Sequence, residues 1–180
     1  FMPKLNTANP EVKAYLLKVA TYWIEEFEID AWRLDVANEI DHQFWRDFRK
    51  AVLAKKPDLY ILGEIWHSSQ PWLNGDEFHA VMNYPLSESI KDYFLRGHKE
   101  TQRFIWEINS QSMYYRQQIS EVMFNLLDSH DTERILTTAK GDLQSVKSAL
   151  AFLYLQRGTP CIYYGTELAL IGGPDPDCRR

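Results

Sequence analysis

The sequence predicts an α/β fold in which parallel strands alternate with helices. Stretches with apolar residues at i, i+3 and i+4 alternate along the chain with short apolar runs that are typical of strands, and five such strands can be counted. Hydrophobic residues make up 45% of the 180 residues, and no repeat or low-complexity segment interrupts them. The chain therefore has enough apolar material for a sizeable globular core.

The first helix is predicted to begin at Asn9-Pro10-Glu11, because Asn can cap a helix and Pro suits its first position. The apolar residues that follow at helical spacing are expected to face the core: Val12, Tyr15, Leu16, Val19, Trp23, Ile24 and Phe27. Residues 29–36 are predicted to form a strand. A second helix is predicted from about Asp41 to Lys56, and Pro57 ends it. Its predicted core-facing residues are Phe44, Trp45, Phe48 and Val52.

The alternation continues with predicted strands over residues 59–63 and near 78–82, followed by mixed helical patterns over 86–115. A fourth strand is predicted over 121–127. Asp142 is expected to cap a helix that turns Leu143, Val146, Leu150 and Leu153 inward, with Gly158 just past its end and a last strand over 159–164. Four tryptophans are assigned to the core: Trp23, Trp32, Trp45 and Trp106.

A closed (β/α)8 barrel typically needs about 250 residues. This chain has 180 residues and opens on a helix. Residues 1–180 are therefore expected to form one part of a TIM barrel, and the opening half of that barrel is missing. In such a barrel the reactive groups gather where the strands end. Three acids of this chain, Asp35, Glu64 and Asp131, each end an apolar, strand-like run.

The composition of the chain indicates which classes of binding partner it suits. The net charge of -5 arises from interspersed acids and bases, which argues against a nucleic-acid surface and suits a neutral substrate. No leader opens the chain and charged or amide residues interrupt every long apolar stretch, so no membrane segment is expected. Cys161 and Cys178 lack metal-binding spacing, which favours reduced thiols and a cytoplasmic setting.

Asp35 and Glu64 suit two different chemical roles. Arg33 and Asp35 share one face of their strand, and the guanidinium is expected to lower the pKa of Asp35, which keeps this carboxylate available as a nucleophile. The alternative is an ordinary salt bridge at a strand end. Glu64 lies among apolar residues that are expected to raise its pKa, so that it holds a proton to donate as a general acid. The alternative is that Glu64 caps the next helix.

His130 and Asp131 form a third polar site after a strand. A carboxylate there could stabilise positive charge on a sugar, and the histidine could donate to ring hydroxyls. A zinc pair is the alternative, but no second histidine lies at ligand spacing. Aromatic rings in loops or at strand ends can stack on pyranoses, although packing is the commoner role. The rings concerned are Trp66, Trp72, Tyr84 and Tyr164.

Several segments resemble the alpha-amylase superfamily, glycoside hydrolase family 13. DAWRLDVANE, LGEIW and LLDSHDTER are similar to the blocks that carry the nucleophile, the acid/base and the stabilising acid, in the family's order and spacing. MPKLN looks like the signature of the neopullulanase, cyclomaltodextrinase and maltogenic amylase branch. The resemblance implies that Asp35 attacks the anomeric carbon, Glu64 protonates the leaving oxygen and Asp131 binds the distorted sugar. Arg33 and His130 would assist.

The same resemblance implies further contacts to the substrate. Asn38, Glu39 and Trp66 look like acceptor-side contacts, and Asp175 and Arg179 like donor-side contacts. The implied substrate is an α-1,4-glucan of modest size, such as a cyclodextrin, a maltooligosaccharide or pullulan, with some tolerance of α-1,6 links. The implied reaction retains the anomeric configuration, because the two carboxyls of retaining sites lie about 5 Å apart.

The resemblance runs from the third helix through the eighth strand of the family's barrel and lacks its first three strands and the C-terminal β-domain. The isolated segment is therefore expected to be inactive, aggregation-prone or paired as a homodimer. No metal or cofactor is assigned, because the usual calcium ligands of the superfamily lie largely outside this stretch. The competing functions are an oligo-α-1,6-glucosidase or α-glucosidase, a non-catalytic relative of the same barrel, and a carbohydrate-binding module.

Overall fold

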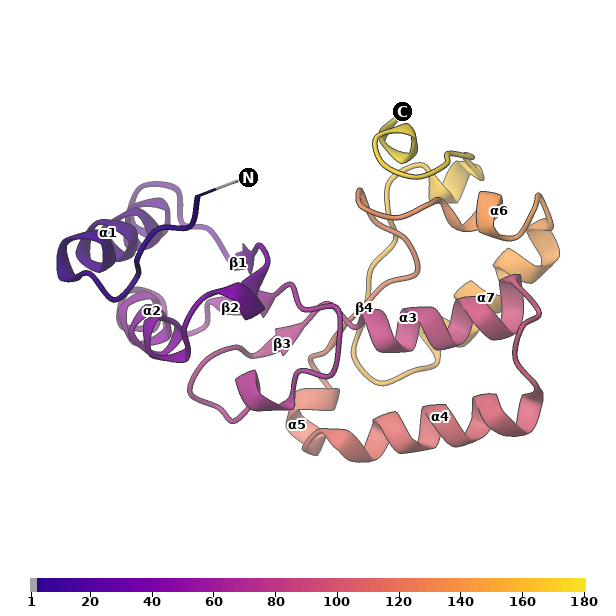
Figure 1. Ribbon diagram of the computed structural model, residues 1–180, viewed down its shortest axis with the longest axis horizontal. Helices are drawn as coiled ribbons and strands as arrows, with labels where there is room; N and C mark the ends of the chain where they lie inside the picture. The colour runs from indigo at the N-terminus through magenta and orange to yellow at the C-terminus, as the bar shows by residue number, and fades with distance from the viewer. Residues whose placement is uncertain (1–2) are drawn as a thin grey trace. The chain divides into compact units, whose positions relative to one another are not determined.

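The computed structural model describes residues 3–180, so Met2, which begins the MPKLN motif, lies outside the described residues. The chain divides into two compact units (Figure 1). The first extends to Ile65 and includes Ser69–Val81, and the second contains Trp66–Ser68 and Met82–Arg180. Among the described residues, no helix combines the length and the apolar character needed to cross a membrane.

The first unit is built on a parallel three-stranded sheet in the order β1-β2-β3. Its strands are β1 (Ala31–Leu34), β2 (Tyr60–Gly63) and β3 (Ala80–Val81). Leu34 pairs with Gly63, and Gly63 pairs with Val81. Because the strands run in the same direction in this register, the residues that follow β1 and β2 leave the sheet at the same end.

Two helices and two 3-10 turns complete the first unit: α1 (Pro10–Phe27), η1 (Ala37–Glu39), α2 (His42–Lys55) and η2 (Gln70–Trp72). The predicted helix start is confirmed, because the Asn9 side chain accepts the N–H groups of Glu11 and Val12 at 2.9 and 3.2 Å. Asp41 caps α2 by accepting the Phe44 N–H at 2.8 Å. The four residues predicted to form the buried side of α2 are all buried.

The predicted core-facing stripe of α1 is largely wrong. Only Ala20 and Ile24 of this helix are buried. Tyr15, Trp23 and Phe27 are 67%, 42% and 59% exposed. The reason is that α1 packs along α2, and a single helix neighbour covers a narrow stripe of the surface.

The second unit holds the remaining elements, in which β4 and β5 pair in parallel. They are α3 (Tyr84–Ile90), the π-helical turn η3 (Lys91–Leu95), α4 (Thr101–Tyr114), α5 (Gln117–Ser120), β4 (Phe124–Asn125), α6 (Ile135–Thr138), α7 (Leu143–Tyr154), β5 (Thr159–Pro160), η4 (Thr166–Leu168) and η5 (Asp177–Arg179). A core cluster joins α3, α4, α6 and α7, with Ile90, Phe104, Ile135 and Leu153 among its members.

Asp142 caps α7 as predicted, since its carboxylate accepts the N–H groups of residues 144 and 145. Val146 and Leu153 are buried, whereas Leu143 is 44% exposed because it lies in the first turn. Gly158 has a φ of 110°, and a Cβ there would lie 2.5 Å from the Met123 carbonyl oxygen. Only glycine fits between α7 and β5.

Two further expectations need correction. The strands predicted over 121–127 and 159–164 are paired over only two residues each, because the chain leaves the sheet after residues 125 and 160 to form loops. Of the tryptophans assigned to the core, Trp45 is 5% exposed but Trp106 is 66% exposed, on the outer face of α4. Trp32 is half-buried, and its ring N–H donates to the Ala20 carbonyl at 3.2 Å.

Candidate active site

The first polar cluster lies where β1 and β2 end. Arg33 is in β1, Asp35 follows β1 and Glu64 follows β2. The main chains are joined at this point, because the Glu64 N–H donates to the Leu34 carbonyl at 2.9 Å and the Ala37 N–H donates to the Glu64 carbonyl at 3.0 Å. The parallel register therefore brings two of the three predicted acids together.

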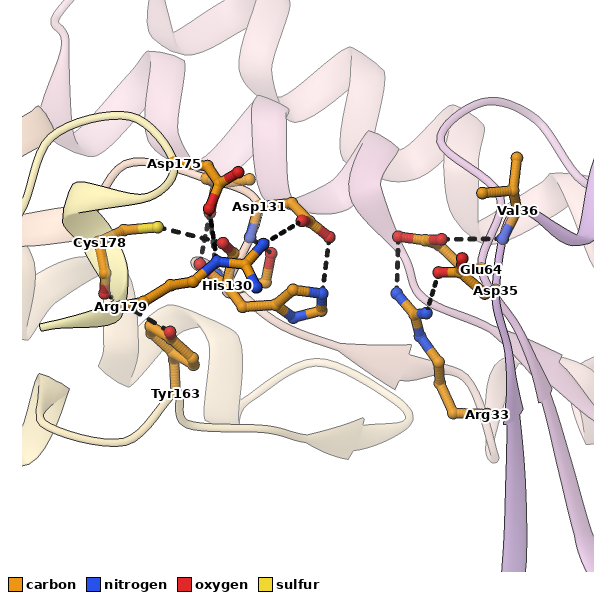
Figure 2. A network of polar contacts seen from close by, with 12 residues as sticks. Arg33, Asp35, Val36, Glu64, His130, Asp131, Tyr163, Asp175, Cys178 and Arg179 are labelled. Carbon is orange, nitrogen blue, oxygen red and sulfur yellow. Dashed lines mark hydrogen bonds and ion pairs between the residues drawn. The ribbon is translucent and has the colours of Figure 1, made fainter. Parts of the chain in front are cut away.

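One guanidinium contacts both carboxylates (Figure 2). Arg33 Nη1 donates to Asp35 Oδ1 at 2.5 Å. Arg33 Nη2 lies 2.7 Å from Glu64 Oε1, which is an ion-pair contact without the angle of a hydrogen bond. The Asp35 side chain is 76% exposed and that of Glu64 is 4% exposed. Arg33 therefore does more than form an ordinary salt bridge at a strand end.

The surroundings of Glu64 include polar partners besides the apolar neighbours that the sequence predicts. Burial is as expected, but the carboxylate faces Arg33 and also accepts the Val36 N–H at 3.0 Å (Figure 2). The alternative prediction, that Glu64 caps the next helix, is also wrong. Its carboxylate accepts an N–H of the segment after β1, and that segment is not a helix that follows Glu64. Apolar neighbours in the sequence do not reveal a cation from the adjacent strand.

Val36 adopts a strained backbone conformation beside the two acids. Its φ is 41° and its ψ is 47°, in the left-handed region that a β-branched residue rarely enters. Such strain persists where the surrounding structure enforces it, and it concentrates at functional sites. Here it accompanies the turn that directs the Val36 N–H at Glu64. No local sequence pattern indicates this conformation.

The predicted acceptor-side residues are divided between the units. Asn38 and Glu39 lie in η1, where the Asn38 amide donates to the Glu39 carboxylate at 3.2 Å. Trp66 and Tyr84, in the second unit, stack face to face with ring centres 3.8 Å apart. Trp66 is 48% exposed, but Tyr84 is 2% exposed.

The buried position of Tyr84 corrects its predicted place in a loop with an open ring. Tyr84 is the first residue of α3, one ring face is covered by Trp66, and its hydroxyl lies 3.5 Å from Ser129 Oγ. Trp72 is also engaged, since its ring packs on that of His42 with centres 5.2 Å apart. Of the four predicted sugar-stacking rings, Trp66 and Tyr164 remain open to solvent, at 48% and 54% exposed.

The second polar cluster surrounds Asp131 in the second unit (Figure 2). His130 Nε2 lies 2.9 Å from Asp131 Oδ2, and Arg179 Nη2 donates to Asp131 Oδ1 at 3.2 Å. Arg179 Nε also donates to Asp175. The Asp131 N–H donates to Ser129 Oγ at 3.2 Å, which fixes the turn. Four predicted site residues are thus brought into one network.

A buried polar layer supports this loop, and sequence analysis missed it. Asp128 is 4% exposed, and its Oδ2 accepts the Ile135 N–H and the Thr166 hydroxyl, each at 3.1 Å. Burial raises the pKa of Asp128, while these two donors and Arg134 oppose the rise. The available signal was a run of charges directly after two leucines, in LLDSHDTER.

The chemistry of the first cluster is that of two carboxyl groups in unlike environments, one exposed and one buried. Such a pair can divide the tasks of nucleophile and proton donor. The second cluster adds a carboxylate that is held by a histidine and an arginine. Among residues 3–180, no three His, Cys, Asp or Glu side chains are grouped as a metal site.

Comparisons with known proteins agree with this geometry. Residues 1–175 match the family described as "Alpha amylase, catalytic domain". The intracellular maltogenic amylase of Bacillus subtilis (strain 168) is 59% identical over 99% of this chain and 30% of its own length. Neopullulanase 2 of Thermoactinomyces vulgaris is 51% identical over 99% of this chain and 30% of its own.

A solved cyclomaltodextrinase structure superposes with a TM-score of 0.97 and 56% identity, over 99% of this chain and 31% of that one. The predicted partial barrel and the predicted branch are confirmed by these similarities. The chain spans about 30% of the length of the curated relatives that it matches.

Proposed function

The chain belongs to the family of alpha-amylase catalytic domains, and from this premise we propose that it carries the three catalytic acids of a retaining glycoside hydrolase that acts on α-1,4-glucans. Asp35 is the nucleophile, Glu64 is the general acid and base, and Asp131 stabilises the sugar as the bond breaks. In this mechanism Asp35 forms a glycosyl-enzyme intermediate, which water then hydrolyses with the help of Glu64.

The observation that carries the proposal is the guanidinium of Arg33 between the carboxylates of Asp35 and Glu64. Retaining enzymes hold their two carboxyl groups about 5 Å apart, which is a separation that one planar guanidinium can bridge. The exposed Asp35 carboxylate is accessible for attack on an anomeric carbon. The buried Glu64 carboxyl group, which lies on the other side of the same guanidinium, is the general acid for the leaving oxygen in this proposal.

Asp131 complements this pair by its charge. A transition state with oxocarbenium character carries positive charge on the sugar ring, and a preoriented carboxylate stabilises that charge. His130 and Arg179 hold the two oxygens of Asp131. Arg179 and Asp175 form the donor-side contacts in this proposal.

The proposed substrates are cyclodextrins, maltooligosaccharides and pullulan, with some cleavage of α-1,6 links. Relatives named maltogenic amylase, cyclomaltodextrinase and neopullulanase support this choice over an α-1,6-specific glucosidase. The word intracellular in the name of one relative supports a cytoplasmic location. Pairing of the chain as a homodimer stays a prediction.

Azide rescue tests both roles in the complete protein that contains this chain. Asp35→Gly and Glu64→Ala should each lower hydrolysis of maltotriose by about 10³-fold or more. With α-maltosyl fluoride, azide should replace the nucleophile in Asp35→Gly and yield the β-glycosyl azide. In Glu64→Ala it should intercept the intermediate and yield the α-glycosyl azide.

Asp58→Asn is the matched control, because Asp58 is an exposed carboxylate of the same unit outside the cluster. It should leave turnover unchanged. Retention of more than a tenth of wild-type turnover by Asp35→Gly would contradict the proposal, as would the opposite assignment of azide products.

A further inference from the structure

Arg134 is a fully buried arginine behind the Asp131 loop, with an exposed fraction of 0%. Its guanidinium carbon lies 4.7 and 4.9 Å from the ring centres of Tyr163 and Tyr164. Nη1 donates to the Tyr164 carbonyl at 2.7 Å, and Nη2 donates to the Arg180 carbonyl at 3.2 Å. The Arg134 main-chain N–H donates to the Gly172 carbonyl at 3.0 Å. One side chain therefore ties together segments that lie 30 to 46 residues away.

The slot around Arg134 is closely fitted. A Cβ on Gly165 would lie 3.1 Å from Arg134 Nη1, and a Cβ on Gly172 would lie 3.3 Å from Arg134 Cδ. The Nε atom is buried without a hydrogen-bond partner. Burying a charged group with an unpaired donor is unfavourable. The burial of a charged arginine with an unpaired Nε–H therefore indicates a role beyond packing.

The segment that Arg134 anchors carries the contacts to Asp131. The Tyr164 hydroxyl donates to the Arg179 carbonyl at 2.6 Å, and the Arg179 side chain donates to Asp131 at 3.2 Å and to Asp175. Arg134 holds the main chain on both sides of these contacts, at residues 164 and 180. The position of the Arg179 guanidinium therefore depends on a side chain that does not itself contact Asp131.

We propose that Arg134 is a positioning residue that fixes the segment 172–180 so that Arg179 orients the Asp131 carboxylate for the transition state. The inference rests on the proposed function and deepens it. Because Asp131 acts on the charge that develops as the bond breaks, a displaced segment lowers kcat and kcat/KM, and because Arg179 and Asp175 also form the donor-side contacts, it raises KM as well. Small displacements of catalytic groups reduce rates by about 10- to 100-fold.

The test uses the complete protein with Arg134→Ala, Arg134→Lys and the control Arg116→Ala, an exposed arginine of the same unit. Turnover of maltotriose is measured with and without millimolar guanidinium chloride, against equal sodium chloride. We expect Arg134→Ala to lose about 10- to 100-fold in kcat. Guanidinium should refill the site beside the two tyrosine rings and restore part of the rate. Arg134→Lys should show the same loss of kcat, because lysine lacks the planar guanidinium that bonds two carbonyls at once.

Hydrogen exchange of residues 172–180 provides a readout that does not depend on catalysis. Exchange should be faster in Arg134→Ala than in wild type, and guanidinium should slow it again. Unchanged exchange there would overturn the inference whatever the activity. So would a rate loss that guanidinium deepens, because a denaturant worsens a merely unstable fold. If Asp35→Gly keeps its turnover, the proposed function fails, and the exchange data still decide whether Arg134 positions this segment.

Discussion

His79 makes the first unit sensitive to acid. This half-buried residue precedes β3, and its Nδ1 accepts the Ile61 N–H of β2 at 3.0 Å. A ring nitrogen can accept only while it carries no proton. Burial, with a smaller contribution from the Arg49 charge, lowers the pKa of His79 from 6.5 to about 4. The folded unit therefore binds this proton less readily than the unfolded chain does.

The sign and size of the effect follow from linkage. For a histidine with a lowered pKa, the contribution to stability is complete above pH 6.5 and is lost as the pH falls toward 4. At about 1.4 kcal/mol per pH unit, the full difference sets an upper bound of about 3 kcal/mol. Because the ring is only half-buried, solvent screening reduces this to about 1.5 kcal/mol, roughly a tenfold change in the opening equilibrium.

Hydrogen exchange of the peptide over residues 59–65 in the complete protein measures the loss. The amide protection factor, which corrects the exchange rate for its intrinsic pH dependence, should fall about tenfold between pH 7.5 and pH 4.5. His79→Asn should abolish most of this fall, because the asparagine oxygen can accept the Ile61 N–H without titrating. His98→Asn, at an exposed histidine, should behave like wild type. Parallel losses in wild type and His79→Asn would refute the reasoning.

Two further substitutions test packing and burial near the acids. Gly63→Ala would place a Cβ 2.7 Å from the Phe78 ring, so it should lower stability in urea unfolding by about 1 to 3 kcal/mol, and an unchanged midpoint would contradict the packing argument. Asp128→Asn should be at least as stable as wild type at pH 7, because burial raises the pKa of Asp128 and the folded state therefore holds the ionised carboxylate less favourably than the unfolded chain does. The amide oxygen can keep both hydrogen bonds. That advantage should shrink in thermal melts as the pH approaches 4, whereas greater stability of wild type at pH 7 would refute it.

Features set by nearby residues could be predicted from the sequence. The Asn9 and Asp142 caps are confirmed because each carboxyl or amide oxygen bonds N–H groups two and three residues away. The acids at the strand ends could be identified because parallel strands deliver consecutive ends to one edge. The buried face of α2 followed from its spacing, and its neighbours cover all of it.

Features set by distant residues could not be predicted. The sequence gives no sign that Glu64 meets Arg33 of the adjacent strand, or that Arg134 reaches carbonyls at residues 164 and 180. The apolar spacing of α1 predicts a wide buried face, but Trp23 is exposed because burial depends on which elements pack against the helix. Periodicity indicates which residues can be buried and says nothing of what covers them.

Trapping of the glycosyl-enzyme tests the central claim, that Asp35 is the nucleophile of a retaining site, most directly. The complete protein is incubated with 5-fluoro-α-D-glucosyl fluoride and its peptides are mapped by mass spectrometry. We predict one fluoroglucosyl ester on Asp35, present also in Glu64→Gln because fluoride leaves without a proton, and absent in Asp35→Asn. A label on another carboxylate, or turnover of the fluoride with no covalent adduct and inverted product, would contradict the account.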